Sequence, residues 1–309
     1  MCKLSRIVLK VLAGILLGLV FAISSVAKLS SLESFELYIF SFGYASFDLC
    51  SIAARLIIIA EFLLGVFLAF NILPRLTRWL TGLSLAGFSI FLLWRAFIGD
   101  VESCHCMGDL VDMNPMQSLI KNIILALLLA YVWKDHGRIL KHQIPVACIT
   151  SAAIIIVVFL AFPPDFYYRG SSESHDLSEE AFRPVADSLG LSTGKRAVCF
   201  YSGSCEHCKH CVSKMAGIIS RHSLPKDSVF VLFMQTHENQ DSVATSFFTE
   251  NGEGLVLPYD YLHPVEFIPL TNGSMPLVVL FEDGKLIKEY DYLSINEKEL
   301  AAFFNDHSL

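Results

Sequence analysis

The sequence predicts an α-helical membrane bundle, with four helices and a fifth linking span, followed by an α/β domain. Of the 309 residues, 54% are hydrophobic and only 17% are charged, which is too apolar for an ordinary soluble protein. Long apolar runs account for this excess in the first half of the chain. The second half is polar, and it alternates strand-like and helix-like patterns around a pair of cysteines.

Five apolar stretches approach the length that crosses a bilayer, over residues 7–27, 52–73, 79–98, 119–133 and 144–162. The fourth is the shortest. The first could instead be a secretory signal peptide, because Ser25-Val26-Ala27 resembles a small-residue cleavage site after a basic start. Its apolar run is longer than that of the usual signal peptide, which favours a span. Cleavage would leave every other segment on the same side of the membrane.

Basic residues on alternate connections predict the orientation by the positive-inside rule. The connections expected in the cytoplasm carry Lys3, Arg6 and Lys10, then Arg75 and Arg78, then Lys134, Arg138 and Lys141. The other connections are mainly acidic, and the chain after residue 162 lies on their side. We therefore predict an integral protein of the inner or plasma membrane, with a cytoplasmic N-terminus and a periplasmic or extracellular C-terminal domain.

A break in composition separates the two halves at Pro163-Pro164 and at the polar run over residues 170–180. The predicted domains are a membrane domain over residues 1–143, the fifth span with a flexible linker over 144–180, and an exterior domain over 181–309. Residues 165–309 contain 11 Lys and Arg against 21 Asp and Glu. Such an acidic domain argues against nucleic acid and anionic lipid as its partners.

The exterior domain shows a readable order of elements. Strands are predicted over residues 196–201, 228–236, 277–281 and 285–290, and helices over 205–221, 237–250 and 296–305. Glu282-Asp283-Gly284 is a strong hairpin signal between the last two strands. Residues 257–274 are expected to form a connection rich in Pro and Tyr.

The segment Cys205-Glu206-His207-Cys208 follows the first strand and a short turn, and it has the pattern of a dithiol redox site. A thiolate at the first turn of a helix is stabilised by unpaired backbone N–H groups and by the positive end of the helix dipole. Cys205 is therefore the expected nucleophile. Cys208, one turn further along, is expected to resolve the mixed disulfide.

This order of elements, with Met275-Pro276 just before the hairpin, resembles the thioredoxin fold over residues 175–309. The resemblance implies that Pro276 is a cis-proline beside the dithiol. The chain departs from thioredoxin itself, because it lacks the usual Trp before the first Cys and has Glu206-His207 in place of Gly-Pro. A His before the second Cys is similar to the oxidising disulfide isomerase and DsbA-type members. Its positive charge would stabilise the Cys205 thiolate and make the disulfide more oxidising, whereas Glu206 opposes this effect.

The membrane part contains Cys104-His105-Cys106-Met107-Gly108 in the exterior loop between the third and fourth spans. Together with the segment from Ser25 to Leu29, this loop resembles the methylamine-utilisation MauE branch of the DoxX-like membrane proteins over residues 5–135. The family loop reads Cys-Gly-Cys-Phe-Gly, so both cysteines and Gly108 match here, and His105 and Met107 depart.

The two resemblances together imply a function in thiol chemistry. Cys205 and Cys208 would exchange electrons with Cys104 and Cys106 and so support disulfide formation or reduction in exported proteins. Vitamin K epoxide reductase relatives have a similar architecture, and by that analogy a membrane quinone is the cofactor to consider. The expected partners are exported protein thiols or disulfides and the lipid bilayer.

Two alternatives compete with the redox interpretation of the dithiol. The pair could be a structural disulfide of an exported domain. The cluster of thiols and imidazoles could also bind zinc or a partner protein, and its five ligands would be Cys205, His207, Cys208, His210 and Cys211. Ligands on one helical segment diverge around its axis, which disfavours a metal.

The remaining cysteines and the charges within spans also have more than one interpretation. Cys104 and Cys106 could have no function. Cys50 is either a thiol that relays electrons to them or a buried cysteine. Cys211 is expected to be a buried small side chain rather than a third redox centre, and Cys2, Cys148 and Cys199 to be bystanders. Glu61 could pair with an Arg or line a quinone pocket. Arg55 and Arg95 are expected to reach out to the interface.

Overall fold

A computed structural model describes residues 2–97, 113–133, 143–170, 179–236, 240–252 and 254–305. The chain forms two compact units. The first, here called the helical unit, comprises Met1–Tyr38 and Ile52–Pro163. The second, called the α/β unit, comprises Ile39–Ser51 and Pro164–Leu309.

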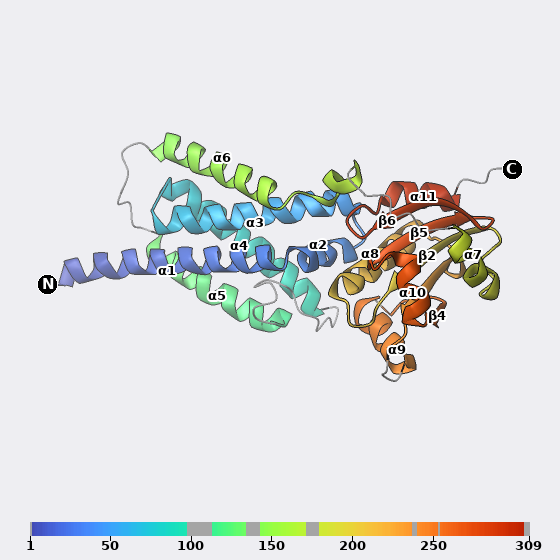
Figure 1. Cartoon of the computed structure of the whole chain (residues 1–309). Helices are drawn as coiled ribbons and strands as arrows, with labels where there is room; N and C mark the ends of the chain where they lie inside the picture. The colour runs from blue at the N-terminus through green and yellow to red at the C-terminus, as the bar shows by residue number, and fades with distance from the viewer. Residues whose placement is uncertain are drawn as a thin grey trace. The chain divides into compact units, whose positions relative to one another are not determined.

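The helical part begins with α1 (Cys2–Ser30) and α2 (Leu32–Ser41) and continues with α3 (Phe47–Ala69), α4 (Pro74–Phe97), α5 (Pro115–Val132) and α6 (Gln143–Ala161). Within the described residues, five of these helices are long and apolar enough to cross a membrane, namely α1, α3, α4, α5 and α6. The five predicted spans are therefore confirmed. Figure 1 shows these helices lying side by side. The short helix α2 was not predicted.

Two glycines bring α1 and α3 into close contact. A Cβ atom on Gly18 would lie 2.5 Å from the carbonyl oxygen of Gly65, and one on Gly65 would lie 2.7 Å from the oxygen of Gly18. Small residues allow such backbone approach in membranes, where helix association depends on packing. Around this crossing, Leu17, Phe21 and Leu68 pack with apolar side chains of α4 and α5.

Glu61, a charged side chain within α3, has a different partner from the expected one. Among the residues that the structure describes, its ion pair is with a Lys and not with an Arg. Its Oε2 lies 2.5 Å from Nζ of Lys28, and its Oε1 accepts a hydrogen bond from Oγ of Ser24 at 2.8 Å. A paired and hydrogen-bonded carboxylate avoids the cost of an isolated charge in an apolar surrounding.

The expectation that Arg55 and Arg95 reach out to the interface is wrong, because only 2% and 4% of their surfaces are exposed. Arg55 forms an ion pair with Glu36 and donates hydrogen bonds to the carbonyl oxygens of Phe162 and Pro163 at 2.7 and 2.9 Å. Arg55 therefore fixes the two residues that come directly after α6. The guanidinium of Arg95 lies over the ring of Tyr38, 5.4 Å from its centre.

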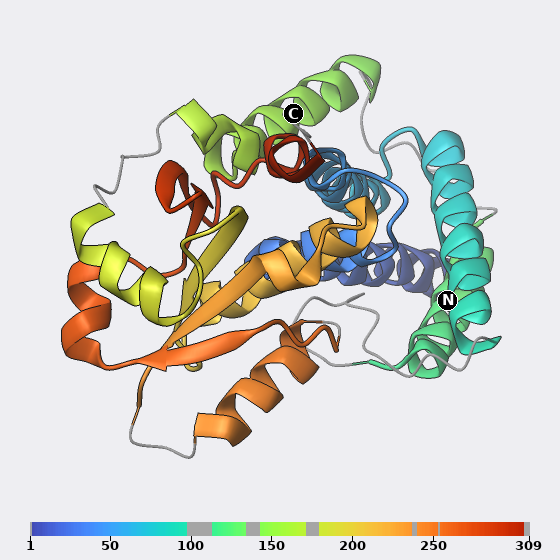
Figure 2. The same cartoon turned by 90° about the vertical axis from the view of Figure 1, so that its right-hand side faces the viewer.

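The α/β unit is built on a five-stranded sheet in the order β4-β3-β2-β5-β6. The strands are β2 (Lys195–Tyr201), β3 (Val229–Met234), β4 (Tyr259–Leu262), β5 (Leu277–Glu282) and β6 (Lys285–Asp291). β2, β3 and β4 run parallel, and β5 runs antiparallel to both of its neighbours, β2 and β6. Figure 2 views this sheet with its helices.

Helices cover both faces of this sheet, as expected of a thioredoxin-like α/β domain. Val198 and Phe200 of β2 face α7 (Glu179–Ser188) and α10 (Pro264–Thr271), where they pack with Phe182 and Phe267. Alternate residues of β2 point to the other face. There Tyr201 contacts α8 (Glu206–His222) and α9 (Gln240–Asn251), and α11 (Glu297–Asn305) also packs near α8.

Three features of this unit depart from the sequence prediction. The connection expected over residues 257–274 contains β4 and α10. The segment expected to be a flexible linker contains the 3-10 helix η1 (Asp165–Gly170), in which Arg169 forms an ion pair with Asp48 at 2.5 Å. The third departure is that Ile39–Ser51, which joins α2 to α3, belongs to this unit.

Candidate dithiol site

Cys205 is the N-cap residue of α8. Its backbone is extended, with φ −84° and ψ 116°, and its Sγ accepts a hydrogen bond from the main-chain N–H of Cys208 at 3.3 Å. A thiolate at this position is stabilised by free N–H groups and by the helix dipole. The turn before it packs closely against α9, where a Cβ atom on Gly203 would lie 2.4 Å from the side chain of Val243. Strand β2 and this turn thus place the sulfur of Cys205 at the first turn of α8.

The two thiols of the pair differ in exposure. Cys205 is half-buried, whereas Cys208 is fully buried. Burial, together with a hydrogen bond to Cys205, raises the pKa of the Cys208 thiol well above its ordinary value. Cys208 therefore keeps its proton while Cys205 meets solvent, which is the asymmetry expected of a resolving thiol and an entering thiol.

The two residues between the cysteines are exposed. The carboxylate of Glu206 lies 2.7 Å from Nζ of Lys209, and this ion pair lowers the pKa of Glu206. Lys209 therefore offsets part of the negative charge that Glu206 brings to the site. The ring of His207 is stacked on the ring of Tyr292, with centres 4.8 Å apart and planes inclined by 26°.

The peptide bond between Met275 and Pro276 is cis. Leu277, the next residue, is paired with Phe200 in the antiparallel ladder between β5 and β2. Pro276 therefore lies at the end of the sheet where β2 leaves for the turn that leads to Cys205. This is the position that the thioredoxin resemblance implied.

Two further thiols lie beneath the site and are fully buried. Burial raises the pKa of the Cys211 thiol to about 12 and that of Cys199 well above its ordinary range. The hydroxyl of Tyr201 donates a hydrogen bond to Sγ of Cys211 at 3.3 Å. These cysteines pack as small core side chains, as expected.

The five ligands of the alternative metal site do not all lie together. Ligand atoms of His207 and His210 lie within 4.8 Å of each other, but among the residues that the structure describes no cysteine of α8 belongs to a group of three or more ligands close enough to share an ion. Cys208 and Cys211 are buried in the core, whereas His207 is exposed. The helix thus places the buried thiols and this imidazole on different sides of its axis.

The other predicted cysteines are not brought to the dithiol by any described contact. Cys104 and Cys106 lie outside the described residues. Cys50 is buried in the first turn of α3, where its thiol donates to the carbonyl oxygen of Ala45 at 3.7 Å. Cys148 lies on an exposed face of α6.

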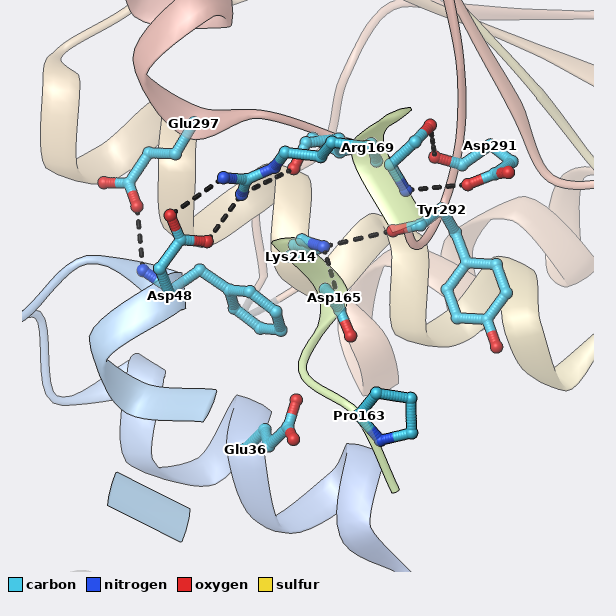
Figure 3. Close-up of polar contacts among 12 residues, drawn as sticks. Glu36, Asp48, Pro163, Asp165, Arg169, Lys214, Asp291, Tyr292 and Glu297 are labelled. Atoms are coloured by element: carbon cyan, nitrogen blue, oxygen red, sulfur yellow. Dashed lines mark hydrogen bonds and ion pairs between the residues drawn. The ribbon is translucent and has the colours of Figure 1, made fainter. Parts of the chain in front are cut away.

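Sequence reasoning missed Tyr292 and the buried residues Lys214 and Asp165. Nζ of Lys214 lies 2.8 Å from Oδ2 of Asp165 and donates to the carbonyl oxygen of Tyr292 at 3.1 Å (Figure 3). A Lys inside the apolar pattern of α8 was the one available signal, because a buried Lys requires a partner. Its partners are far away along the chain and could not be identified without the fold.

Comparison with known proteins agrees with this architecture. Residues 5–134 match the model of the family described as "Methylamine utilisation protein MauE". The chain is also 24% identical to "Protein TlpB" of Flavobacterium psychrophilum over 348 aligned positions, which cover 92% of this chain and 91% of that protein. The family match confirms the resemblance found for the membrane part, and the alignment with the relative extends through both units.

Proposed function

We propose that this protein is a membrane-bound thiol-disulfide oxidoreductase acting on exported proteins. The observation that carries the proposal is the pair formed by a half-buried Cys205 at the N-cap of α8 and a fully buried Cys208 beneath it. The cis peptide at Pro276, at the same end of the sheet, supports it. Residues 5–134 match the family described as "Methylamine utilisation protein MauE", and the resemblance to that family implied a redox-associated membrane domain, which adds support.

The chemistry follows from the asymmetry of the two thiols. The thiolate of Cys205 attacks one sulfur of a client disulfide, the client S–S bond breaks, and one client thiolate leaves. Cys208 then loses its proton and attacks Sγ of Cys205, which releases the second client thiolate. Two electrons pass to the client, and the two protons that leave the dithiol are taken up by the two new thiols of the client. The reverse sequence oxidises a client dithiol.

The membrane half would renew the redox state of this pair. In the proposal, the Cys205–Cys208 pair exchanges two electrons with Cys104 and Cys106 by the same thiol chemistry. The segment Ile39–Ser51 belongs to the α/β unit, which supports the expectation that the connection between the first two spans and the C-terminal domain share one side of the membrane. By alternation, the loop with Cys104 and Cys106 is on that side as well.

A membrane quinone finds no support at Glu61. The polar groups around this residue, Ser24 and Lys28, are hydrogen-bonded to it and to each other. Both oxygens of the Glu61 carboxylate therefore have partners within the protein, and neither is directed toward a ligand. We therefore derive no step through a quinone.

The test is a redox titration of the full chain in detergent micelles. Protein equilibrated with glutathione buffers of graded ratio is quenched in acid, alkylated and analysed by peptide mass spectrometry. Cys205 and Cys208 should convert together in one two-electron transition, and a Cys211→Ala control should have the same midpoint. If the pair shows no transition, or if one equivalent of zinc protects its thiols from alkylation, the metal-binding alternative replaces the redox proposal.

A further inference from the structure

A short turn after β6 supplies an aromatic ring to the dithiol site. The ring of Tyr292, in this turn, lies 4.8 Å from the ring of His207, and the two planes are inclined by only 26°. His207 is exposed on the first turn of α8, between the two cysteines. Its ring also contacts the ring of His210, with centres 6.5 Å apart. The stack gives His207 one preferred position.

The turn itself, residues 291–295, is firmly held by hydrogen bonds within it. The main-chain N–H of Ser294 donates to Oδ1 of Asp291 at 2.7 Å, and its hydroxyl donates to the carbonyl oxygen of Asp291 at 3.1 Å. Ser294 and Ile295 are almost fully buried. The turn is therefore a rigid support and not a mobile loop tip.

Two cations attach this turn to the rest of the unit (Figure 3). Lys214 of α8, which is 3% exposed, donates to the carbonyl oxygen of Tyr292 at 3.1 Å. Arg169 of η1 donates to the carbonyl oxygen of Ile295 at 3.4 Å. Lys214 is in turn neutralised by Asp165 at 2.8 Å and lies 4.1 Å from the centre of the Phe47 ring. The buried Lys214 and the partly buried Arg169 thus fix the backbone that they contact.

We propose that Tyr292 is a positioning residue of the dithiol site, which holds the imidazole of His207 by stacking and thereby makes the Cys205–Cys208 disulfide more oxidising. This inference rests on the proposed redox function. The face of an aromatic ring attracts a cation, so the phenol ring stabilises the protonated imidazole. That positive charge stabilises the Cys205 thiolate, which exists only after reduction. Reduction of the disulfide is therefore favoured.

The measured quantity is the equilibrium constant for reduction by glutathione, in which two glutathione molecules give one dithiol and one glutathione disulfide. An exposed cation–π contact corresponds to about a two- to fivefold change in an equilibrium constant. Tyr292→Leu should lower the constant by no more than this factor, or about 20 mV at 29.6 mV per tenfold, because only the part of the contact that strengthens on reduction affects the equilibrium. Tyr292→Phe keeps the ring and should retain the wild-type constant.

A double-mutant comparison tests whether Tyr292 acts through His207. In a His207→Ala background, Tyr292→Leu should leave the constant unchanged, because the stacked partner is gone. An equal shift in both backgrounds would overturn the proposal and assign the effect to the turn. A Tyr292→Phe variant that behaves like Tyr292→Leu would also overturn it.

The stack can be measured without any redox reaction. With ¹³C-labelled histidine, the ring protons of His207 should show an upfield ring-current shift that is lost in Tyr292→Leu and kept in Tyr292→Phe. If the dithiol fails to titrate and this shift is present, the redox function is wrong and the stacking is right. If the dithiol titrates and the shift is absent, the positioning role is wrong.

Discussion

The main-chain N–H of Phe47 donates a hydrogen bond to Oε2 of Glu297 at 2.8 Å, although the two residues are 250 positions apart. Phe47 begins α3, and a helix leaves its first N–H groups without internal partners. The carboxylate of Glu297, from α11, is a partner for one of these N–H groups, and it interacts favourably with the helix dipole. Its other oxygen lies 3.1 Å from Nε of Arg221 and 2.8 Å from Nε2 of His222. Glu297 thus joins α3, α8 and α11.

Glu297→Ala should lower the free energy of unfolding of the α/β unit by about 1 to 3 kcal/mol, because it leaves the buried N–H of Phe47 without its acceptor. The three tryptophans of the chain all precede Pro163, so fluorescence would not report on this unit. Alkylation of the buried thiols Cys199 and Cys211 across a denaturant series gives a direct readout.

The matched control for this change is Glu299→Ala on the same helix. Glu299 accepts a hydrogen bond from the hydroxyl of Tyr290 at 2.9 Å. It also pairs with Lys288 at the surface, where both side chains are about half exposed. Such a pair contributes less than about 1 kcal/mol. If Glu299→Ala lowers the free energy of unfolding as much as Glu297→Ala does, the hydrogen bond to Phe47 does not explain the effect of Glu297→Ala.

The contact between α8 and Ile39–Ser51 depends on a glycine. A Cβ atom on Gly217 would lie 2.3 Å from the ring of Phe40. We expect Gly217→Ala to destabilise the unit by about 1 to 3 kcal/mol through overpacking. In a Phe40→Ala background the ring is gone, so Gly217→Ala should no longer destabilise the unit, and it should stabilise it slightly because Ala is favoured over Gly inside a helix by about 1 kcal/mol. Protease protection of residues 39–51 would measure both effects, and the double variant must be at least as well protected as Phe40→Ala alone.

These contacts also explain what sequence reasoning reached and what it missed. Strand β2, helix α8 and the hairpin β5-β6 have local signals, namely apolar runs, an N-cap Cys and an Asp-Gly turn, so their positions were predicted. The helix α10 contains Pro269, and β4 has only four residues, so both were read as a connection.

The contacts of Lys214, Arg55 and Glu61 join residues distant in sequence. A pattern of local periodicity carries no information about which distant charge will be a partner. Hence the sequence indicated that the intramembrane charges needed partners, but it did not indicate that Glu61 would meet Lys28 or that Arg55 would bind carbonyl groups after α6.

Exposure and ionisation predict which thiol reacts in the reduced protein. At pH 8, iodoacetamide should modify Cys205 and leave Cys208 intact, because burial raises the pKa of Cys208 and shields it. Cys205→Ser should remove the fast alkylation of the peptide that contains residues 205–208, and Cys211→Ala should leave it unchanged. Peptide mass spectrometry identifies the modified residue. Fast labelling of Cys208 in the wild-type protein would reverse the assignment of the two roles.

The buried thiols predict a loss of stability at alkaline pH. The pKa of Cys211 is raised from 9.0 to about 12 by burial, so the folded protein holds a proton that the unfolded chain releases. This contribution to stability is complete below pH 9 and is lost as the pH rises from 9 to about 12.

One such thiol makes the free energy of unfolding fall with pH, with a slope that approaches about −1.4 kcal/mol per pH unit above pH 9. Cys211→Ala should therefore lower stability at pH 7 and show a shallower decline between pH 8 and pH 10. Denaturation midpoints, read by accessibility of Cys199, give the two slopes. Parallel curves for wild type and variant would mean that Cys211 does not hold its proton in the folded state.

Coupling between the two halves can be tested by trapping the intermediate of thiol exchange. Exchange proceeds through a mixed disulfide, so Cys208→Ser removes the resolving thiol and should leave Cys205 bonded to its last partner. We predict a bond from Cys205 to Cys104 or Cys106. A protease site inserted within residues 171–178 would then give two fragments that stay joined until reduction. Cys205→Ser, combined with Cys208→Ser, should give separate fragments, as should removal of both loop cysteines. If Cys205 is trapped only on separate exported proteins and never on the loop peptide, the α/β unit works without the loop thiols, and the helical unit serves as an anchor or has an activity of its own.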